Sequence, residues 1–374
     1  MNKVLSAVSG LIVFALIIYF TFSTRFFSWD FRNNLWAPAY LIIQRESAYN
    51  INLIFNDSNS IWFPQVIGLF FFLGFLPQYL ATNTWFILNI ALLLVLIRYL
   101  IRQSDHEKIK SLYLGLLALS VFIFPPTIRH LILGQADILL MMSLIAGVYS
   151  IERRQLMLGG FFFALALVKP QHCIVVLPSV FIYLLFAKRA LRDGLKVFIT
   201  TCLFVILQTA PLWFSGPIWV NDFLSNLQKN PDWAQPSIFS ILHNSLGAIG
   251  FAFWFIIYAT IIALNFQIWS KHKPEKAVLW SLASTAIISP YLWSWDFVLL
   301  LPLFIDTLIR LSNTLSKLIL LTFYIICFFG SIFALQSGTA SDEVLWWFPL
   351  VLITGVTISI VVDKILRKKQ FAVL

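Results

Sequence analysis

Ionisable side chains are scarce in this chain of 374 residues, and those that could do chemistry stand where apolar runs begin or end. The first is Asp30, eight residues beyond an apolar run that ends at Phe22, with Arg32 two residues later. A carboxylate in this position could serve in acid–base chemistry. It could equally be a solvated loop residue that caps a helix starting near Leu35. The sequence leaves both readings of Asp30 open.

A second group of polar residues lies at the start of another apolar run. Arg129 and His130 precede Gln135, and Asp137 falls in the first turn of the helix that the run predicts. If this helix start faces outward, its free N–H groups and dipole could bind a phosphate, and Arg129 could add a charge-assisted contact. In the alternative, Arg129 reaches lipid headgroups while Gln135 and Asp137 only cap the helix.

A lysine marks the boundary between two later apolar runs, in Lys169-Pro170-Gln171-His172. We expect Lys169 to contact a phosphate or another part of a substrate, with Gln171 and His172 beside it. A purely structural role remains open, because Pro170 stops a helix and a lysine is favourable at a helix C-terminus.

Two tryptophans and a carboxylate, Trp293, Trp295 and Asp296, follow Ser289-Pro290. Asp296 is expected to be the N-cap of the next helix. The tryptophans could anchor the membrane interface or stack on a sugar ring. The topology below places 11 of the 14 tryptophans on the same outer side, which an anchor belt at both surfaces does not explain (residues 29, 36, 62, 85, 213, 219, 233, 293, 295, 346 and 347).

Metal and nucleotide sites have no support in the sequence pattern. The outer histidines His130, His172 and His243 are far apart and show no ligand spacing. No Walker loop or G-x-G-x-x-G motif follows a strand. The three cysteines are also widely separated and predict neither a disulfide framework nor a zinc site. We therefore expect no metal and no cofactor.

The composition predicts a membrane protein. The chain is 60% hydrophobic and 11% charged, against roughly a quarter charged in soluble proteins, which excludes a soluble enzyme. Its net charge of +10 is better explained by basic cytoplasmic loops than by nucleic-acid binding.

Apolar runs predict an all-α, polytopic membrane protein with about twelve transmembrane helices in a single domain, residues 1–374. The runs cover residues 4–22, 84–101, 111–126, 135–150, 156–169, 173–187, 195–213, 248–269, 277–290, 297–311, 318–336 and 345–362. With residues 98–110 placed inside, every later basic loop also falls inside. Only Arg129, Lys169 and Lys229 of the 22 basic residues after position 84 are then outside.

The orientation of the first eighty residues is less clear, because residues 61–80 are apolar but are interrupted by Pro64, Gln65, Pro77 and Gln78. If this segment spans, the N-terminus is outside and 4 of 26 basic residues are external. If it is an interfacial or re-entrant helix, the N-terminus is inside and 6 of 26 are external. The charge count slightly favours the first option. The resemblance described next favours the second, with both termini cytoplasmic and external loops at about 23–83 and 214–247.

Several of these stretches, in order over residues 1 to about 302, resemble the polyprenyl-phosphate-dependent membrane glycosyltransferases of the GT-C fold, in particular the family 87 mannosyltransferases. The matching stretches are Asp30, Ile61-Trp62-Phe63-Pro64 through Phe75-Leu76-Pro77, Leu133-Gly134-Gln135-Ala136-Asp137-Ile138-Leu139-Leu140, Ala166-Leu167-Val168-Lys169-Pro170-Gln171, and Ser289-Pro290 through Trp295-Asp296. The chain departs from the expected pattern at His243-Asn244-Ser245-Leu246, where Asn-Gln-Ser-Leu is usual, and at Ala136-Asp137, where Val-Asn is usual.

The resemblance implies an inverting transfer of a hexose, expected to be mannose, from a polyprenyl-phosphate donor to a glycan or lipid outside the cytoplasmic membrane. Asp30 would be the catalytic base, and Arg129, Gln135 and Lys169 would bind the donor phosphate. The remaining substrate-binding candidates are Arg32, His130, Asp137, Gln171, His172, His243, Asn244, Trp293, Trp295 and Asp296.

The alternative is a membrane transporter or lipid flippase without transferase chemistry. Transporters commonly show internal repeats and bind substrate at broken helices near the midplane. No repeat is evident here, and the polar residues lie at helix ends. A noncatalytic membrane scaffold would not need this outer polar cluster.

Overall fold

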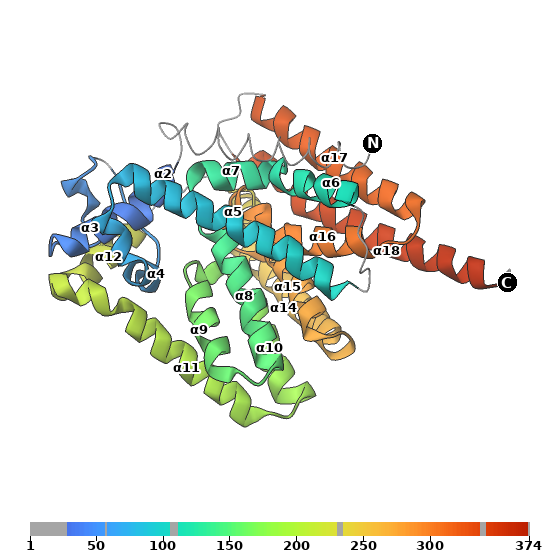
Figure 1. Cartoon of the computed structure of the whole chain (residues 1–374), viewed down its shortest axis with the longest axis horizontal. Coiled ribbons are helices and arrows are strands. Elements are labelled where there is room, and N and C mark those ends of the chain that lie inside the picture. Colours follow the sequence, from blue (N-terminus) through green and yellow to red (C-terminus); the bar gives the residue numbers. More distant parts are fainter. Residues whose placement is uncertain (1–27, 57, 105–110, 230–234, 337–341, 373–374) are drawn as a thin grey trace.

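The structure, a computed structural model, describes residues 28–56, 58–104, 111–229, 235–336 and 342–372. The regular elements within these ranges are all helical (Figure 1). The first predicted span, residues 4–22, lies outside the described residues. The helical class predicted from the sequence is therefore confirmed for the described part of the chain.

Five helical segments are long and apolar enough to cross a membrane. They are α5 (Gln78–Gln103), α11 (Leu191–Thr209) with η6 (Ala210–Ser215), α14 (Ala248–Lys271), α17 (Thr314–Gln336), and α18 (Phe348–Ala372) with η8 (Asp342–Leu345). A sixth span is formed if α6 (Ser111–Phe122) and α7 (Pro125–Leu133), bent by 58° at their junction, are counted together. These helices make the chain a membrane protein.

Several predicted spans are helices of fewer than 18 residues. They are α8 (Asp137–Glu152), α9 (Leu156–Ala166), α10 (Val176–Ile182) with η5 (Tyr183–Ala187), α15 (Pro274–Ile288), and η7 (Asp296–Leu300) with α16 (Leu301–Arg310). A helix needs about 20 residues to cross the hydrocarbon core, so the predicted number of twelve spans is not confirmed. Most residues of α8 are buried, as expected for a helix that is apolar on all sides.

The region expected to form the first external loop is a series of short helices. They are α2 (Trp29–Phe31), η1 (Arg32–Trp36), α3 (Ala37–Ile43), η2 (Ile51–Leu53), α4 (Pro64–Leu69) and η3 (Phe71–Phe75). The apolar stretch 61–80 is thus broken into pieces of six and five residues before α5 begins. Neither piece can cross a membrane, which agrees with the interfacial reading of this stretch.

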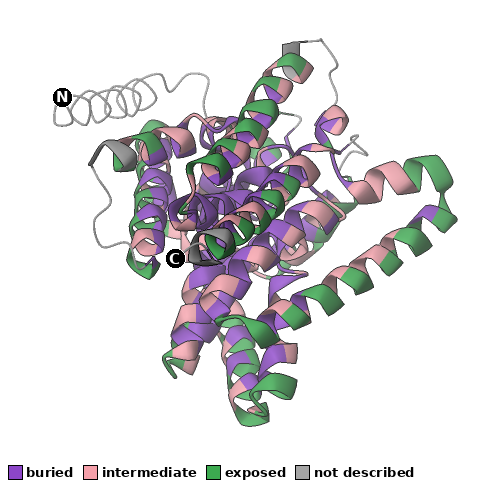
Figure 2. Ribbon diagram, turned by 90° about the vertical axis from the view of Figure 1, so that its right-hand side faces the viewer, coloured by how far each residue is buried: buried purple, intermediate pink, exposed green. Residues whose placement is uncertain are grey.

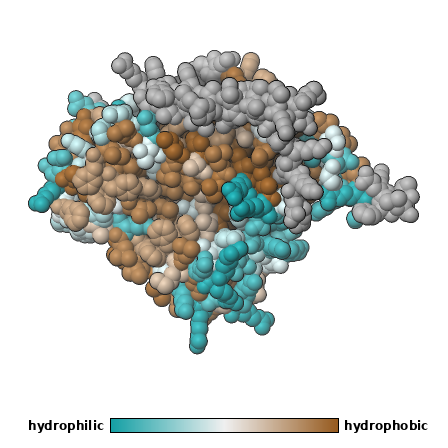
Figure 3. Space-filling model, viewed as in Figure 1, coloured by the Kyte–Doolittle hydropathy of each residue, from teal (hydrophilic) through white to brown (hydrophobic). Residues whose placement is uncertain are grey.

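The second expected external loop is also partly helical, with α12 (Ile218–Gln228) and α13 (Ile238–Leu246). Much of the surface in Figure 3 is hydrophobic, and hydrophilic residues gather along its lower edge, near the α8–α9 and α10–α11 connections. On α14, only 11% of the apolar window is buried inside the protein. Such a surface is suited to contact with lipid.

Buried residues concentrate where the helices meet in the middle of the molecule, and exposed ones follow the projecting helices (Figure 2). α8 packs against α5, α9 and α15. The short helix η4 (Pro170–His172) connects α9 to α10. This packing brings the start of α8, the Lys169 turn and the start of η7 together.

Candidate active site

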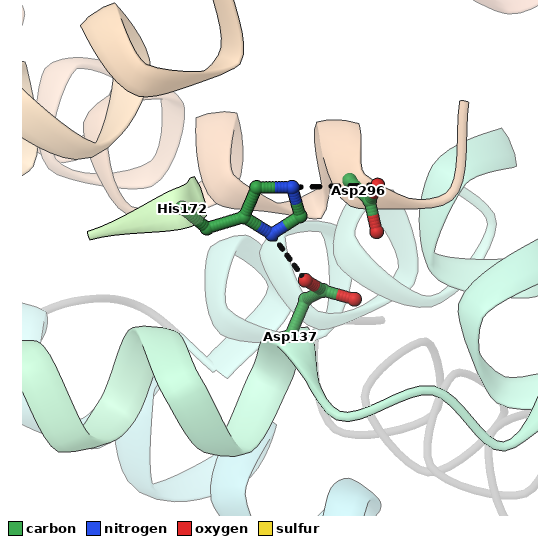
Figure 4. A group of neighbouring side chains, drawn as sticks. All are labelled: Asp137, His172 and Asp296. Atoms are coloured by element: carbon green, nitrogen blue, oxygen red, sulfur yellow. Dashed lines mark hydrogen bonds and ion pairs between the residues drawn. The ribbon is translucent and has the colours of Figure 1, made fainter. Parts of the chain in front are cut away.

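Four polar side chains, Asp137, Lys169, His172 and Asp296, form a buried group that we call the carboxylate cluster (Figure 4 shows three of them). Lys169 Nζ donates hydrogen bonds to Asp137 Oδ2 at 2.7 Å and to Asp296 Oδ1 at 2.8 Å. His172 Nδ1 lies 2.8 Å from Asp137 Oδ1, and its Nε2 lies 3.5 Å from Asp296 Oδ2. All four residues were predicted as site residues, and the structure brings them into direct contact.

Each member is positioned by the end of a helix. Asp137 is the first residue of α8, and Lys169 precedes Pro170, the first residue of η4. Asp296 opens η7 but is not its N-cap, because Trp295 holds that position. The Asp296 side chain instead accepts hydrogen bonds from the Trp293 backbone N–H, at 2.7 Å, and from Lys169 Nζ. The expected capping role of Asp296 is therefore wrong, and the carboxylate is used in a tertiary contact.

The cluster places two carboxylates around one ammonium group in a site nearly closed to water. The Asp137 and Asp296 side chains are 0% and 1% exposed, and that of Lys169 is 10% exposed. Burial and the nearby Asp137 raise the pKa of Asp296. Since a buried charge without a partner is costly, Lys169 is needed to keep the two carboxylates in place.

Three of these residues could also offer ligands to a metal ion. One ligand atom from each of Asp137, His172 and Asp296 lies within 4.8 Å of the others, and mixed imidazole and carboxylate sets suit ions such as zinc. The Lys169 ammonium, however, already contacts both carboxylates. The set fits a metal only if Lys169 moves away. Histidine spacing alone could not reveal this set, because two of its three members are carboxylates.

Asp30 lies on α2 and is half-buried. Gln135 Nε2 donates a hydrogen bond of 2.6 Å to Asp30 Oδ2. Burial raises the pKa of Asp30 to about 6, although the positive charge of Lys169 and the Gln135 hydrogen bond act to lower it. We call these two residues the Asp30–Gln135 pair. A carboxylate of this kind is ionised near neutral pH and is also basic enough to accept a proton.

Tight packing around Gly134 holds α2 against the turn before α8. Gly134 has φ +70°, and a Cβ there would lie 2.6 Å from Phe31 Cβ. Trp85 on α5 donates its indole N–H to the Gly134 carbonyl at 2.9 Å and stacks on Phe31 at 5.5 Å. Because Gly134 and Gln135 are adjacent, this contact sets the position of Asp30 relative to Gln135.

Arg129 lies apart from the carboxylate cluster. It donates to Asp342 Oδ1 at 2.6 Å and to the Ser294 hydroxyl, and its guanidinium lies 5.2 Å from the Trp295 ring centroid. Its side chain remains 27% exposed. Asp342, which also accepts the Ser294 backbone N–H, was not singled out from the sequence. No local pattern links it to a residue 213 positions away.

The remaining candidates near the cluster have clear partners. The Trp293 and Trp295 rings stack at 5.0 Å with an interplanar angle of 9°. His130 is fully buried, with Nδ1 3.6 Å from Asp137 Oδ2 and Nε2 3.4 Å from Asn89 Oδ1. His130 therefore packs against Asp137 of the carboxylate cluster and is not accessible to a substrate.

Four other candidates do not join the cluster. The Arg32 guanidinium lies over the rings of Trp29 and Phe55, at 4.2 and 4.1 Å, and the ion pairs of the described residues do not link it to Asp30. Gln171 is half-buried, and its backbone carbonyl accepts the Ser289 hydroxyl. His243 and Asn244 are exposed on α13, where His243 stacks on Phe239.

Of the comparisons with known proteins, the one with family models gives a match and the one with curated proteins gives none. A family model described as "Glycosyltransferase family 87" matches residues 64–290, which is more than half of the chain. The matched region contains Arg129, Gln135, Asp137, Lys169 and His172, whereas Asp30 and Asp296 lie outside it. No curated protein matches the chain.

Proposed function

The chain belongs to glycosyltransferase family 87, and we propose that it transfers a hexose, expected to be mannose, from a polyprenyl-phosphate donor to a glycan or lipid acceptor with inversion. Family membership and the long apolar helices make it a membrane glycosyltransferase. The observation that supports the mechanism best is the half-buried Asp30 carboxylate, held by Gln135 and with a pKa of about 6.

In the proposed reaction, Asp30 accepts the proton of the acceptor hydroxyl as its oxygen attacks the anomeric carbon. The new glycosidic bond forms on one face of the sugar while the bond to the phosphate oxygen breaks on the other. The lipid phosphate leaves with the bonding electron pair. A single displacement inverts the anomeric centre, by analogy with inverting glycoside chemistry, and one general base contributes typically about 10²- to 10⁴-fold in rate.

The leaving phosphate needs fixed positive charge nearby. Arg129 pairs with Asp342, but its guanidinium is partly exposed and lies over Trp295, so we propose that its remaining N–H groups contact the phosphate. Gln135 lies in the turn before α8, whose dipole also favours an anion. Lys169 already donates to both Asp137 and Asp296, which leaves one of its three N–H donors for a phosphate oxygen. We propose that its first task is to balance these carboxylates. The Lys169 ammonium group is thus the positive charge of the carboxylate cluster. We propose that the transfer needs no metal and no cofactor.

The stacked pair of Trp293 and Trp295 offers an aromatic surface for the sugar ring. We propose that the exposed His243 and Asn244 on α13 contact the acceptor. A lipid-linked donor is compatible with the absence of a nucleotide motif in the sequence. The basic loops after residue 84 favour a cytoplasmic C-terminus and an extracytoplasmic site in the plasma or inner membrane. The family resemblance, and not the charge count, favours a cytoplasmic N-terminus as well.

The substrate class can be tested with the purified full-length protein in lipid nanodiscs. Polyprenyl-phosphate mannose, polyprenyl-phosphate glucose and a nucleotide-linked mannose are each supplied with glycan and glycolipid acceptors, and product is measured. We expect product from lipid-linked mannose, with an anomeric configuration opposite to that of the donor. Transfer only from the nucleotide sugar, retention of configuration, or movement of the lipid-linked sugar across the membrane without product would contradict the proposal.

A further inference from the structure

A cavity of about 620 Å³ lies where the ends of α14, α15, α16 and α18 meet. An adjoining cavity of about 290 Å³ extends this space toward the end of α5, and the two share His272, Lys276, Asp306 and Arg310. We call the two together the basal cavity. Its volume is in the range of small-ligand sites.

The basal cavity is on the opposite side of the helix bundle from the carboxylate cluster. α15 begins at Pro274 beside this cavity and ends at Ile288, next to Ser289, whose hydroxyl bonds the carbonyl of Gln171. At 1.5 Å per residue, the 15 residues of α15 cover about 22 Å. α16 likewise leads from the Asp296 side to Arg310. The basal cavity is therefore a separate site, at the other end of α15 and α16 from the carboxylate cluster.

Two of its basic residues are already neutralised by carboxylates. Arg310 pairs with Asp306 at 2.6 Å, and Arg367 pairs with Asp363 at 2.7 Å. Arg310 also donates to the Gln103 carbonyl, and Arg367 donates to the Arg310 carbonyl. These contacts leave the two arginines with a structural role, in which they hold the ends of α5, α16 and α18 together.

In the larger cavity, two lysines supply the remaining positive charge. Lys276 on α15 and Lys364 on α18 both line the larger cavity, and the ion pairs of the described residues include neither of them. Lys276 is half-buried and Lys364 is exposed. The lining of the larger cavity has two aspartates and four lysine or arginine residues. The smaller cavity adds Lys271, Lys273 and Glu275, so the basal cavity as a whole has an excess of positive charge.

Part of the wall of the larger cavity is apolar. Ile268, Leu303 and Ile360 line the larger cavity together with the half-buried Trp280. A cavity with cations at its rim and aliphatic or aromatic walls matches a molecule that has a phosphate at one end and hydrocarbon behind it. Basic pockets between membrane helices are recognised sites for anionic lipid headgroups.

We infer that the basal cavity binds the headgroup of an anionic membrane phospholipid, with Lys276 and Lys364 contacting the phosphate and the apolar wall contacting the start of an acyl chain. This site is distinct from the proposed transferase site and does not depend on that reaction. A lipid bound there would link the ends of α15, α16 and α18, so its binding should stabilise the folded protein.

The test uses the full-length protein in neutral detergent, titrated with dioctanoyl phosphatidylglycerol, dioctanoyl phosphatidylcholine or glycerol phosphate while Tm is followed by tryptophan fluorescence. Phosphatidylglycerol is expected to raise Tm in a saturable way, with phosphatidylcholine and glycerol phosphate far weaker. The double variant Lys276→Gln/Lys364→Gln should bind phosphatidylglycerol at least about tenfold more weakly. The matched double variant Arg192→Gln/Lys196→Gln removes the same charge from exposed positions on α11 and should behave like the wild type.

Equal responses to the two phospholipids, or unchanged phosphatidylglycerol affinity in the Lys276→Gln/Lys364→Gln variant, would overturn the inference. The same would follow if the α11 variant lost as much affinity, because the effect would then be general charge attraction. Glycerol phosphate binding as tightly as phosphatidylglycerol would show a soluble-anion site instead. If the double variant has a lower Tm without lipid, the exposed Lys364→Gln single variant provides the same comparison with less effect on the fold.

Discussion

The pKa of Asp30 leads to a quantitative prediction for the pH dependence of transfer. Its pKa is raised from an ordinary value of 3.8 to about 6 because the carboxylate is buried. A base acts in its ionised form, so activity should be present above this pKa and lost as the pH falls through it. With a pKa of about 6, the ionised fraction falls about tenfold from pH 7 to pH 5. With the ordinary pKa, it would fall by less than about a tenth.

The Gln135→Leu variant tests the origin of this pKa. Gln135 donates to the carboxylate at 2.6 Å and thereby favours its charged form. A hydrogen bond to a charged group contributes about 1.5 kcal/mol or more, which corresponds to about one pKa unit. The acid limb of the profile should therefore move from about pH 6 to about pH 7. Relative to the variant's own plateau at high pH, its rate at pH 7 should be about twofold lower and should come close to that plateau at pH 8. Loss of Gln135 from the phosphate site would lower the plateau itself.

The assay measures kcat/KM for transfer from the lipid-linked donor between pH 4.5 and 8.5, because this quantity reports the pKa values of the free enzyme. Gln228→Leu, an exposed position on α12, is the matched control and should keep the wild-type profile. A wild-type rate that stays level between pH 7 and pH 5 would refute Asp30 as a base with a raised pKa. An acid limb that moves to lower pH in Gln135→Leu would refute the role of this hydrogen bond.

Three further predictions concern the support and location of the site. Lys169→Ala leaves two buried carboxylates facing each other and should lower the free energy of unfolding by about 3 to 5 kcal/mol, measured by thermal melting. Lys169→Arg keeps the positive charge and should lose much less stability. Near-normal Tm values in both variants would contradict the structural role of Lys169. Gly134→Ala places a Cβ against Phe31 at a positive φ. It should lower the free energy of unfolding by about 1 to 3 kcal/mol and remove most of the transferase activity. Transfer at the wild-type rate would show that the position of α2 need not be fixed. A cysteine replacing the exposed Trp29, in a Cys202→Ser background, should react with an impermeant thiol reagent added outside intact cells; reaction only after lysis would place Asp30 in the cytoplasm.

The helical membrane character of the chain could be read from its composition, but the number of spans could not. Apolar runs such as 135–150 and 277–290 look alike whether the helix faces lipid or protein. In the structure, α8 and α15 are shorter than a membrane and are mostly buried, whereas α14 is largely exposed. This difference depends on tertiary packing, which hydropathy alone does not contain.

Several residues predicted from the sequence as site candidates lie together in the structure, but their contacts could not be predicted. Asp137, Lys169, His172 and Asp296 were identified because polar residues at the ends of apolar helices are unusual, and the structure joins them in one cluster. Their pairing could not be predicted, since Lys169 and Asp296 are 127 positions apart. The Arg129–Asp342 ion pair could not be predicted either, because the two residues are also far apart in the sequence. His243 and Asn244 have the same polarity signal but lie on the exposed helix α13, away from the cluster.

The central claim is that Asp30 removes the proton from the acceptor, and the Asp30→Asn variant tests it most directly. Asparagine has nearly the same shape and can still accept the Gln135 hydrogen bond, but it cannot serve as a base at neutral pH. Single-turnover transfer from polyprenyl-phosphate mannose at pH 7 should fall about 10²- to 10⁴-fold. Tm and donor binding should stay close to wild type, and Asp222→Asn on α12 should transfer normally. A folded Asp30→Asn protein that transfers at the wild-type rate would contradict the claim.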